Sequence, residues 1–193
     1  MTVITLSRQL GSLGFETAKL LAPRLGYRLV WRDLINQAAR RAGAPEVALA
    51  MIDELNLLGF KPSVEDILAY LKAIKTVMLE LADAGNVIIV GRAGQILLAD
   101  HRNSIHLRMI APVGLRVERL ANRLGISVEA ARAQIDASDR YHQRYFKRYY
   151  KIPWDGPGLY DLTINTAKMT PNDAVDIICA AVGKCECHER ATL

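Results

Sequence analysis

The stretch VITLSRQLGSLGFETAKL, residues 3–20, decides the fold prediction. Its apolar beginning, Val3 to Leu6, predicts a buried strand, and the apolar residues after Gly14 recur on one side of a helix that begins near Phe15. A strand, a glycine-containing loop and a helix in this order can cradle a phosphate group, because the loop turns backbone N–H groups inward and the helix N-terminus adds partial positive charge. The same stretch also fits a tight turn whose glycines only permit close packing.

The loop differs from the common phosphate-binding signature, G-x-x-x-x-G-K-[ST]. No lysine follows Gly14, because the next residue is Phe15. Arg8, at the entry of the loop, is our candidate for reaching donor phosphates in place of that lysine, although a surface position at the sheet edge also suits it. The candidate phosphate-binding residues of the loop are Gly11, Ser12, Leu13 and Gly14, and either Ser12 or Thr17 is the candidate hydroxyl for Mg²⁺.

The other apolar runs predict a parallel sheet. Buried strands are expected at Val87 to Val90, Ile105 to Ile110 and Leu162 to Ile164, with a weaker one at Arg28 to Val30. Long helical patterns separate most of these runs. Because strands that alternate with helices form a parallel sheet covered on both faces, the chain is expected to have an α/β fold.

Capping signals mark two of the helices. Ser63 with Asp66 resembles a capping box at the start of one helix, and Gly85 suits its C-terminal end. Within that helix the apolar residues fall on one face, and they are Ile67, Leu71, Ile74, Met78 and Leu81. Thr170 followed by Pro171 predicts the start of a second helix.

Length and composition limit the possible classes of protein. The 193 residues suit one domain, which we expect to carry two appendages, an inserted segment at about 31–63 and a polar, aromatic-rich segment at about 125–158. With 51% hydrophobic and 23% charged residues, disorder or a disulfide scaffold is not expected. Three cysteines gathered near the C-terminus, no basic leader and no long apolar run indicate a cytoplasmic protein with no membrane span.

The positions of the basic residues indicate an anionic ligand. The net charge of +5 favours anionic partners in general. Gly91 and Arg92 directly follow an apolar strand, so they are expected at the carboxyl edge of the sheet, where open α/β sheets bind ligands. Arg116, Arg119 and Arg123 have spacings of 3 and 4, which puts three guanidinium groups on one helix face. Without a functional role, Arg92 would be an arginine in a turn, and the three arginines at 116, 119 and 123 would form a solvated helix face.

Four motifs together resemble the cytidylate kinase-like family of P-loop proteins. They are Ser7-Arg8-Gln9-x-Gly11-Ser12-x-Gly14-x-Glu16-x-Ala18, Ile88-Ile89-Val90-Gly91-Arg92-Ala93, Arg116-Val-Glu-Arg119 and Asp161-Leu-Thr-Ile-Asn165-Thr166, and they span nearly the whole chain in order. The resemblance implies a P-loop NTPase-type three-layer fold with a five-stranded parallel sheet, an inserted helical monophosphate-binding segment and a lid. It also implies an ATP-dependent kinase that uses Mg²⁺ and phosphorylates CMP or a related nucleoside monophosphate.

The resemblance assigns roles to several of these residues. The Gly91-Arg92 pair would hold the acceptor phosphate, a task that suits the planar fork of arginine. Arg116 and Arg119 would clamp donor phosphates or stack on the base, and Asn165 would lie where a donor base is held. Arg8, Arg92 and Arg119 are therefore the candidate catalytic residues.

The run DRYHQRYFKRYYK, residues 139–151, interleaves basic and aromatic residues. By resemblance it belongs to the lid, and Asp139, Arg140 and Arg144 are the candidate nucleotide-binding residues there. The same composition also suits single-stranded nucleic acid, because aromatic rings stack on bases while cations meet phosphates. We prefer the lid interpretation and small-molecule nucleotides as partners.

Some features favour a nucleotide-binding or regulatory module that kept the fold and lost the chemistry. The loop lysine is absent, and Val90 and Ala93 stand where cytidylate kinases tend to have aspartates. Asp33 is either a compensating acid or a helix cap. The tail Cys185-Glu186-Cys187-His188 lacks paired metal-ligand spacing, so we expect free thiols rather than structural zinc. Apolar residues at Leu55 to Leu58 offer a surface for a homodimer.

Overall fold

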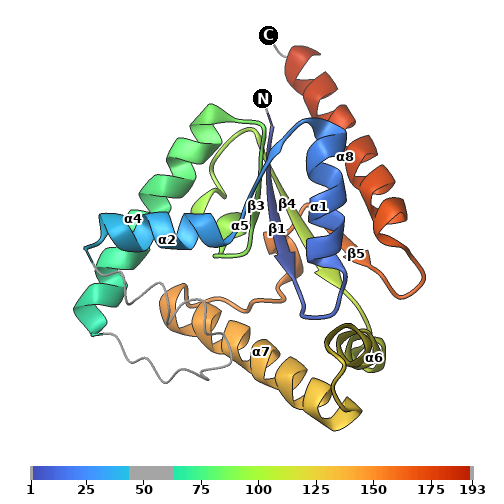
Figure 1. Cartoon of the computed structure of the whole chain (residues 1–193). Helices are drawn as coiled ribbons and strands as arrows, with labels where there is room; N and C mark the ends of the chain where they lie inside the picture. The colour runs from blue at the N-terminus through green and yellow to red at the C-terminus, as the bar shows by residue number, and fades with distance from the viewer. Residues whose placement is uncertain (1, 44–62, 192–193) are drawn as a thin grey trace.

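A twisted sheet of five parallel strands forms the centre of the computed structural model, which describes residues 2–43 and 63–191, without the side chains of residues 32, 33, 35 and 184–191 (Figure 1). The strands are β1 (Val3–Arg8), β2 (Arg28–Val30), β3 (Val87–Val90), β4 (Ser104–Ile110) and β5 (Leu162–Asn165). Their order in the sheet is β2-β3-β1-β4-β5. All four pairings are parallel, so every strand ends at the same edge of the sheet. The predicted strands and the parallel arrangement are confirmed.

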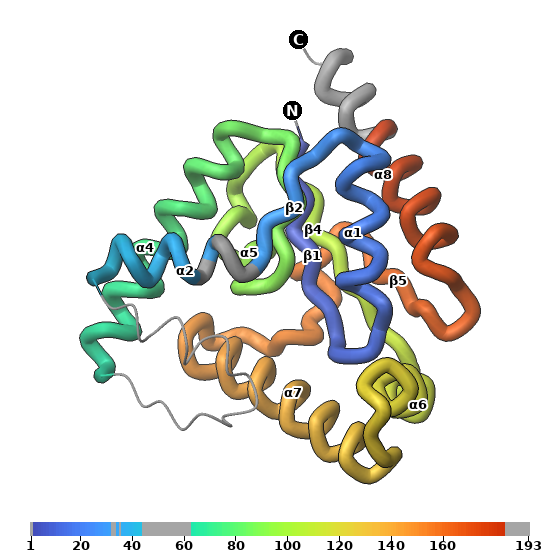
Figure 2. The backbone as a smooth tube through the Cα atoms, viewed as in Figure 1, coloured from blue at the N-terminus to red at the C-terminus, as the bar shows by residue number. Residues whose placement is uncertain are grey.

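Helices cover both faces of this sheet (Figure 1). The helical elements are α1 (Gly14–Leu25), α2 (Arg32–Arg41), α4 (Val64–Ala84), α5 (Gly94–Leu97), α6 (Val113–Leu124), α7 (Val128–Tyr149), the 3-10 turn η1 (Pro157–Leu159) and α8 (Pro171–Ala191). Helices α1 and α8 pack on one face, and α2 and α4 pack on the other. Figure 2 shows α7 passing beneath the carboxyl ends of the strands, at the end of the molecule opposite to both chain termini.

The predicted helix ends agree with the structure. The Ser63 hydroxyl accepts a hydrogen bond from the Asp66 N–H at 3.1 Å, and Gly85 ends α4 in a conformation with a φ of +68°. At the start of α8, the Thr170 hydroxyl accepts from the Asp173 N–H at 3.2 Å, while the Asp173 carboxylate accepts from the Thr170 N–H at 2.8 Å. These reciprocal bonds satisfy N–H groups that a helix start otherwise leaves unpaired.

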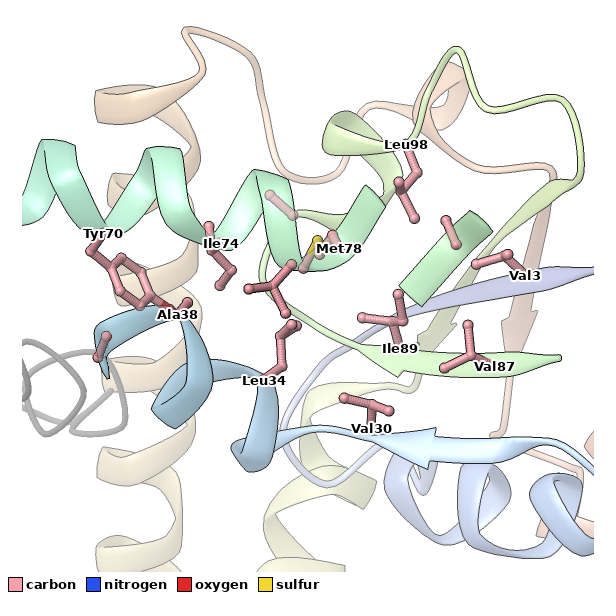
Figure 3. Packing of buried hydrophobic residues seen from close by; sticks show 14 of the residues in the cluster. Val3, Val30, Leu34, Ala38, Tyr70, Ile74, Met78, Val87, Ile89 and Leu98 are labelled. Carbon is pink, nitrogen blue, oxygen red and sulfur yellow. The ribbon is translucent and has the colours of Figure 1, made fainter. Parts of the chain in front are cut away.

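The buried face of α4 is rotated slightly from the predicted one. Ile74 and Met78 are buried as expected, but the other buried side chains include Tyr70 and Val77, whereas Ile67 is only half-buried. Figure 3 shows Tyr70, Ile74 and Met78 packed over Leu34 and Ala38 of α2, next to the strands. Burial of a tyrosine moved the contact stripe towards the side of α4 that faces α2 and α7.

The second half of α7 is part of the protein core. Tyr145, Phe146 and Trp154 are buried and belong to the same cluster as the α2 and α4 side chains. Much of the aromatic content of the segment 125–158 stabilises the fold, and the role of this segment as a lid stays a prediction. Of the inserted segment expected at 31–63, residues 44–62, and with them Leu55 to Leu58, lie outside the described residues. Within the described part, the helices are too short or too polar to cross a membrane.

Candidate functional site

The loop between β1 and α1 curls back on itself before the helix begins. Gly11 has a φ of +82° and Leu13 a φ of +60°, both in the left-handed region, and the Ser12 N–H donates to the Gln9 carbonyl at 3.2 Å. A Cβ atom at Gly14 would stand 2.6 Å from the Arg8 Cβ. At Gly11 it would stand 2.7 Å from the Arg116 carbonyl oxygen. Glycine is therefore required at both positions, because α6 and the start of the loop approach the backbone too closely for a side chain.

The two candidate hydroxyls of the loop are turned away from its opening. The Ser12 hydroxyl donates to the Gln9 carbonyl at 2.8 Å, and the Thr17 hydroxyl donates to the Leu13 carbonyl at 2.8 Å. Both side chains are fully buried, and neither lines the cavity at the loop. No group of three possible metal ligands gathers among the described residues. The described side chains alone do not form a magnesium site, so a bound Mg²⁺ would also need oxygen atoms of the nucleotide phosphates.

Two cavities adjoin at the carboxyl edge of the strands. The first has a volume of about 130 Å³ and lies between the phosphate loop and α7. The second has a volume of about 20 Å³ and lies at Gly91 and Arg92. Both are lined by Arg8, Trp31 and His142. Arg8 lines both cavities and Arg92 lines the second, so the two arginines lie near each other.

Arg8 reaches from the phosphate loop to the Gly91-Arg92 pair. Its Nη1 atom lies 3.4 Å from the point where a Cβ at Gly91 would stand. The residues Gly91, Arg92 and Ala93 have φ values of +81°, +57° and +56°. Two successive non-glycine residues in the left-handed region cost conformational energy, and such strain concentrates at functional sites.

Arg92 lies among tyrosines of α4 and α7. Burial raises the pKa of Tyr70, Tyr145 and Tyr150, and the positive charge of Arg92 opposes this shift in each case. The hydroxyl of Tyr70 is buried without a hydrogen-bond partner among the described residues. The surroundings of Arg92 are thus rich in aromatic side chains.

The three arginines of α6 share one face, as predicted, and all three contact the loop or the start of α1. Arg116 forms a bidentate ion pair with Asp139 of α7, at 3.2 and 2.8 Å, and donates to the Leu10 carbonyl at 3.4 Å. Arg119 donates to the Gly11 carbonyl at 3.5 Å and to the Thr166 hydroxyl and carbonyl at 3.0 and 2.8 Å. Arg123 pairs with Glu16 at 2.9 Å.

These contacts change the interpretation of Arg116 and Arg119. A role in clamping donor phosphates requires both guanidinium groups to face the cavity at the phosphate loop. In the structure they contact protein groups instead, and neither lines the two cavities described above. They hold α6 and α7 against the phosphate loop, so their direct contact with a nucleotide stays a prediction.

The basic and aromatic residues of α7 lie on different sides of the helix. Arg140 and Arg144 are exposed and line neither cavity, whereas Tyr145 and Phe146 are buried. The structure therefore does not bring Arg140 and Arg144 to the loop. Tyr145 and Phe146 are not available on the exposed face, and nucleic-acid binding by residues 139–151 stays a prediction.

Asn165 has a local partner and faces a different cavity. Its side-chain oxygen accepts from the Ala167 N–H at 3.0 Å, which is a turn contact. The side chains of Asp33, Cys185, Cys187 and His188 lie outside the described residues. Cys179 is a free thiol, and burial raises its pKa.

Sequence reasoning assigned no binding role to three residues that line the loop cavity, which are Phe15, Trp31 and His142. His142 stacks on Trp154 with ring centres 4.5 Å apart, and its Nδ1 atom lies 2.8 Å from the Ser138 carbonyl oxygen. The spacing of three between Asp139 and His142 placed both on one helix face, and this signal was available. Phe15 packs on Trp31 with ring centres 4.4 Å apart, so an aromatic pair occupies the wall next to the position where the common signature has lysine.

Comparisons with known proteins agree with this architecture. Residues 3–168 match the model of a family described as the cytidylate kinase-like family. A cytidylate kinase of Sulfolobus acidocaldarius is 33% identical over 188 residues, which cover 96% of each chain. A cytidylate kinase of Ignicoccus hospitalis is 31% identical over 178 residues, 92% of this chain and 97% of the other.

Two solved structures show the same fold at low sequence identity. An uncharacterized protein from Eubacterium ventriosum superposes with a TM-score of 0.76 at 19% identity, covering 95% of this chain and 99% of the other. A shikimate kinase from Acinetobacter baumannii superposes with a TM-score of 0.54 at 17% identity, covering 95% and 94%. The α/β P-loop fold expected from the sequence is confirmed.

Proposed function

The chain belongs to the cytidylate kinase-like family, and from this premise we propose that it transfers the terminal phosphoryl group of MgATP to CMP or a closely related nucleoside monophosphate. Membership of the family supports a kinase-like function in general. The choice of CMP as acceptor rests on what the relatives are named for.

The position of Arg8 between the two cavities is the observation that carries this proposal. Transfer between two phosphates needs little covalent help from the protein, which must align donor and acceptor and neutralise charge on the group that moves. An arginine at the junction is placed to contact that group from either side. Its planar fork also binds phosphate oxygens in pairs, so Arg8 is a suitable substitute for the missing lysine.

The surrounding residues have separate roles in this proposal. The loop from Gly11 to Gly14 and the N-terminus of α1 would bind the donor phosphates, and Arg92 would bind the acceptor phosphate. Arg116 and Asp139 would hold α6 and α7 in position over the loop, because their ion pair joins the two helices. Direct contacts from Arg119, Arg140, Arg144 and Asn165 to nucleotide are further parts of the proposal.

The acceptor side must open before a monophosphate binds. Its cavity of about 20 Å³ is close to the space of a single water molecule. Tyr145 and Phe146 of α7 form part of its wall. We therefore expect these aromatic side chains to move when the acceptor enters, and the nucleotide base to replace some of their contacts.

The proposal is tested by steady-state assays of the purified chain with MgATP and a panel of CMP, dCMP, UMP, AMP and GMP. CMP or dCMP should be the best acceptor. Arg92→Gln should raise the KM for the acceptor by about tenfold or more, because a charge-assisted bidentate contact is lost. Arg28→Gln is the matched control, since Arg28 is exposed at the amino end of β2. A chain that turns over none of the five acceptors contradicts the proposal.

A second candidate is a nucleotide-binding module without kinase activity. The wall formed by Phe15 and Trp31, together with the inward-facing hydroxyls of Ser12 and Thr17, favours it. Calorimetry with ATP distinguishes the two candidates: nucleotide binding without turnover supports the module, and turnover of any acceptor excludes it.

A further inference from the structure

A third cavity, of about 540 Å³, lies at the carboxyl ends of β4 and β5. Its wall includes Arg108, Ile110, Pro112, Tyr160 and Thr163. Strand residues alternate between the two faces of a sheet, and Leu107 and Met109 pack in the cluster of α1 and α8. Arg108 and the cavity therefore lie on the opposite face of the sheet. Of the residues that line the cavity at the phosphate loop, this cavity shares only Gln9.

Arg108 is a buried cation in the wall of this cavity. It is only 5% exposed. Its Nη1 atom donates to the Trp154 carbonyl at 2.8 Å and to the Tyr160 hydroxyl at 3.0 Å. Its guanidinium carbon lies 4.4 Å from the centre of the Trp154 ring and 5.1 Å from that of Tyr160. These contacts fix the plane of the guanidinium group.

The charge of Arg108 has no anionic partner among the described residues. No carboxylate of the described chain forms an ion pair with it, and Asp155, which also lines the cavity, is exposed. Burial of an unpaired charge is costly, so such a group is normally paired with an anion. The two aromatic rings offset part of this cost, because they attract the cation through their faces.

The donors of Arg108 that remain are on one edge of the guanidinium group. Its hydrogen bonds to the described residues all use Nη1, and neither Nε nor Nη2 is a fully buried atom without a partner. Nε and Nη2 therefore keep some exposure, and Arg108 is part of the cavity wall. Two parallel N–H groups at such an edge match the two oxygens of a carboxylate or phosphate.

We propose that this cavity binds a small organic anion whose phosphate or carboxylate group pairs with the Nε and Nη2 edge of Arg108. The apolar part of the ligand packs against Ile110, Pro112 and Pro157, which form the apolar wall. The cavity shares Gln9 with the cavity at the phosphate loop, and its wall also contains Asn165, a proposed nucleotide contact, but Arg108 has no role in the proposed kinase reaction.

The test uses the two tryptophans of the chain as separate reporters. Trp31 lines the cavity at the phosphate loop, and Trp154 contacts Arg108. In the Trp31→Phe variant, Trp154 is the remaining tryptophan. Phenyl phosphate and benzoate are titrated separately, each against sodium chloride at the same ionic strength. We expect a saturable change in Trp154 fluorescence with at least one of the two probes, and the comparison between them distinguishes a phosphate from a carboxylate ligand.

Variants in the same Trp31→Phe background locate the binding site. Arg108→Lys keeps the charge but loses the fork, and it should weaken binding by about tenfold or more. Thr163→Phe fills the cavity from an exposed position without altering Arg108, and it should abolish the fluorescence change. Thr76→Phe, at an exposed position on α4, is the matched control and should leave binding unchanged.

Three results would overturn the proposal. One is the absence of a saturable signal with both probes. Another is a signal that survives in Thr163→Phe, because the anion would then bind elsewhere, for example at the phosphate loop. A third is probe binding that occurs only in the Asp155→Asn variant, because Asp155 would then be the counter-ion of Arg108 in solution. Kinase assays on Thr163→Phe show whether the variant still transfers phosphate. A failure of anion binding is thereby distinguished from a failure of the proposed function.

Discussion

Replacement of Gly11 by alanine tests how tightly α6 is held against the phosphate loop. Gly11 has a φ of +82°, and a Cβ there would lie 2.7 Å from the Arg116 carbonyl oxygen and 3.0 Å from the Arg116 Cα. Gly26, at the end of α1, has a φ of +68° but nothing within 4 Å of its Cβ position. The two glycines therefore share the backbone strain and differ in the steric contact.

The expected magnitudes follow from these two terms. A non-glycine residue in the left-handed region costs about 1–2 kcal/mol, which both Gly11→Ala and Gly26→Ala should show as lost stability. Overpacking against backbone atoms that cannot rotate away costs about 1–3 kcal/mol more, and only Gly11→Ala should show it. The midpoint of thermal unfolding should therefore fall further for Gly11→Ala, by about 2–4 °C per kcal/mol for a chain of this length.

The assay is urea unfolding followed by far-UV circular dichroism, with thermal melting as a second measurement. If Gly11→Ala and Gly26→Ala have equal free energies of unfolding, α6 does not press on the loop as described, and the account of Arg116 and Arg119 as residues that hold the loop is wrong. A Gly11→Ala variant that also loses ATP binding, beside a Gly26→Ala variant that keeps it, would connect this packing to the site.

Three further predictions concern stability. Asp139→Asn should lower the free energy of unfolding by about 2–3 kcal/mol, because it leaves the buried guanidinium of Arg116 without its partner charge. Asp136→Asn breaks an exposed i,i+4 pair with Arg132 and should cost about 0.5 kcal/mol or less. Equal losses in urea unfolding would contradict the structural role of the buried pair. Tyr70→Phe should leave stability unchanged or raise it, since the Tyr70 hydroxyl is buried without a partner among the described residues. Tyr160→Phe should cost about 1–3 kcal/mol, because the Tyr160 hydroxyl donates to the Trp154 carbonyl at 2.7 Å and accepts from Arg108 at 3.0 Å. A loss of stability in Tyr70→Phe as large as that in Tyr160→Phe would refute this difference. Burial lowers the pKa of His106 below its ordinary 6.5, against the opposing charge of Asp161, so the unfolded chain binds this proton first as the pH falls. Stability should therefore decrease below about pH 6.5. His106→Gln should reduce the decrease measured by urea unfolding at pH 7 and pH 5, and an unaltered decrease would assign it to other groups.

Local sequence signals accounted for much of the fold. The strands β3 and β2 begin and end at the predicted residues. For β3 the reason is that Val87 to Val90 are apolar at every position, as in a strand buried on both faces. Helix ends at Ser63, Gly85 and Thr170 were predictable because capping is a property of a few neighbouring residues.

The candidate site was predictable in part. The carboxyl edge of the strands and the shared face of the α6 arginines follow from strand direction and helix periodicity. The proximity of Arg8 to Gly91 needs β1 and β3 to be neighbours, and strand order is set by tertiary packing. In α7, basic and aromatic residues alternate too closely for the pattern to reveal which side faces the core.

The environment of Arg108 was outside the reach of sequence reasoning. Its partners, Trp154 and Tyr160, lie about fifty residues further along the chain, in a segment that crosses the sheet after α7. The local sequence shows only that an arginine stands inside an apolar strand. Whether that arginine is buried depends on the later segment that crosses the sheet. Long-range contacts of this kind also explain why Arg116 and Arg119 bind protein groups instead of facing the cavities.

The central claim is that Arg8 joins a donor loop and an acceptor pair in one phosphoryl-transfer site. The most direct test measures the rate of CDP formation from MgATP and CMP by the wild-type chain, Arg8→Gln and the control Arg28→Gln. Loss of one group that stabilises charge in the transition state lowers kcat by about 10²–10³-fold. We therefore predict a loss of that size for Arg8→Gln and wild-type rates for Arg28→Gln. Equal rates for Arg8→Gln and the wild type, or no CDP from either, would contradict the claim.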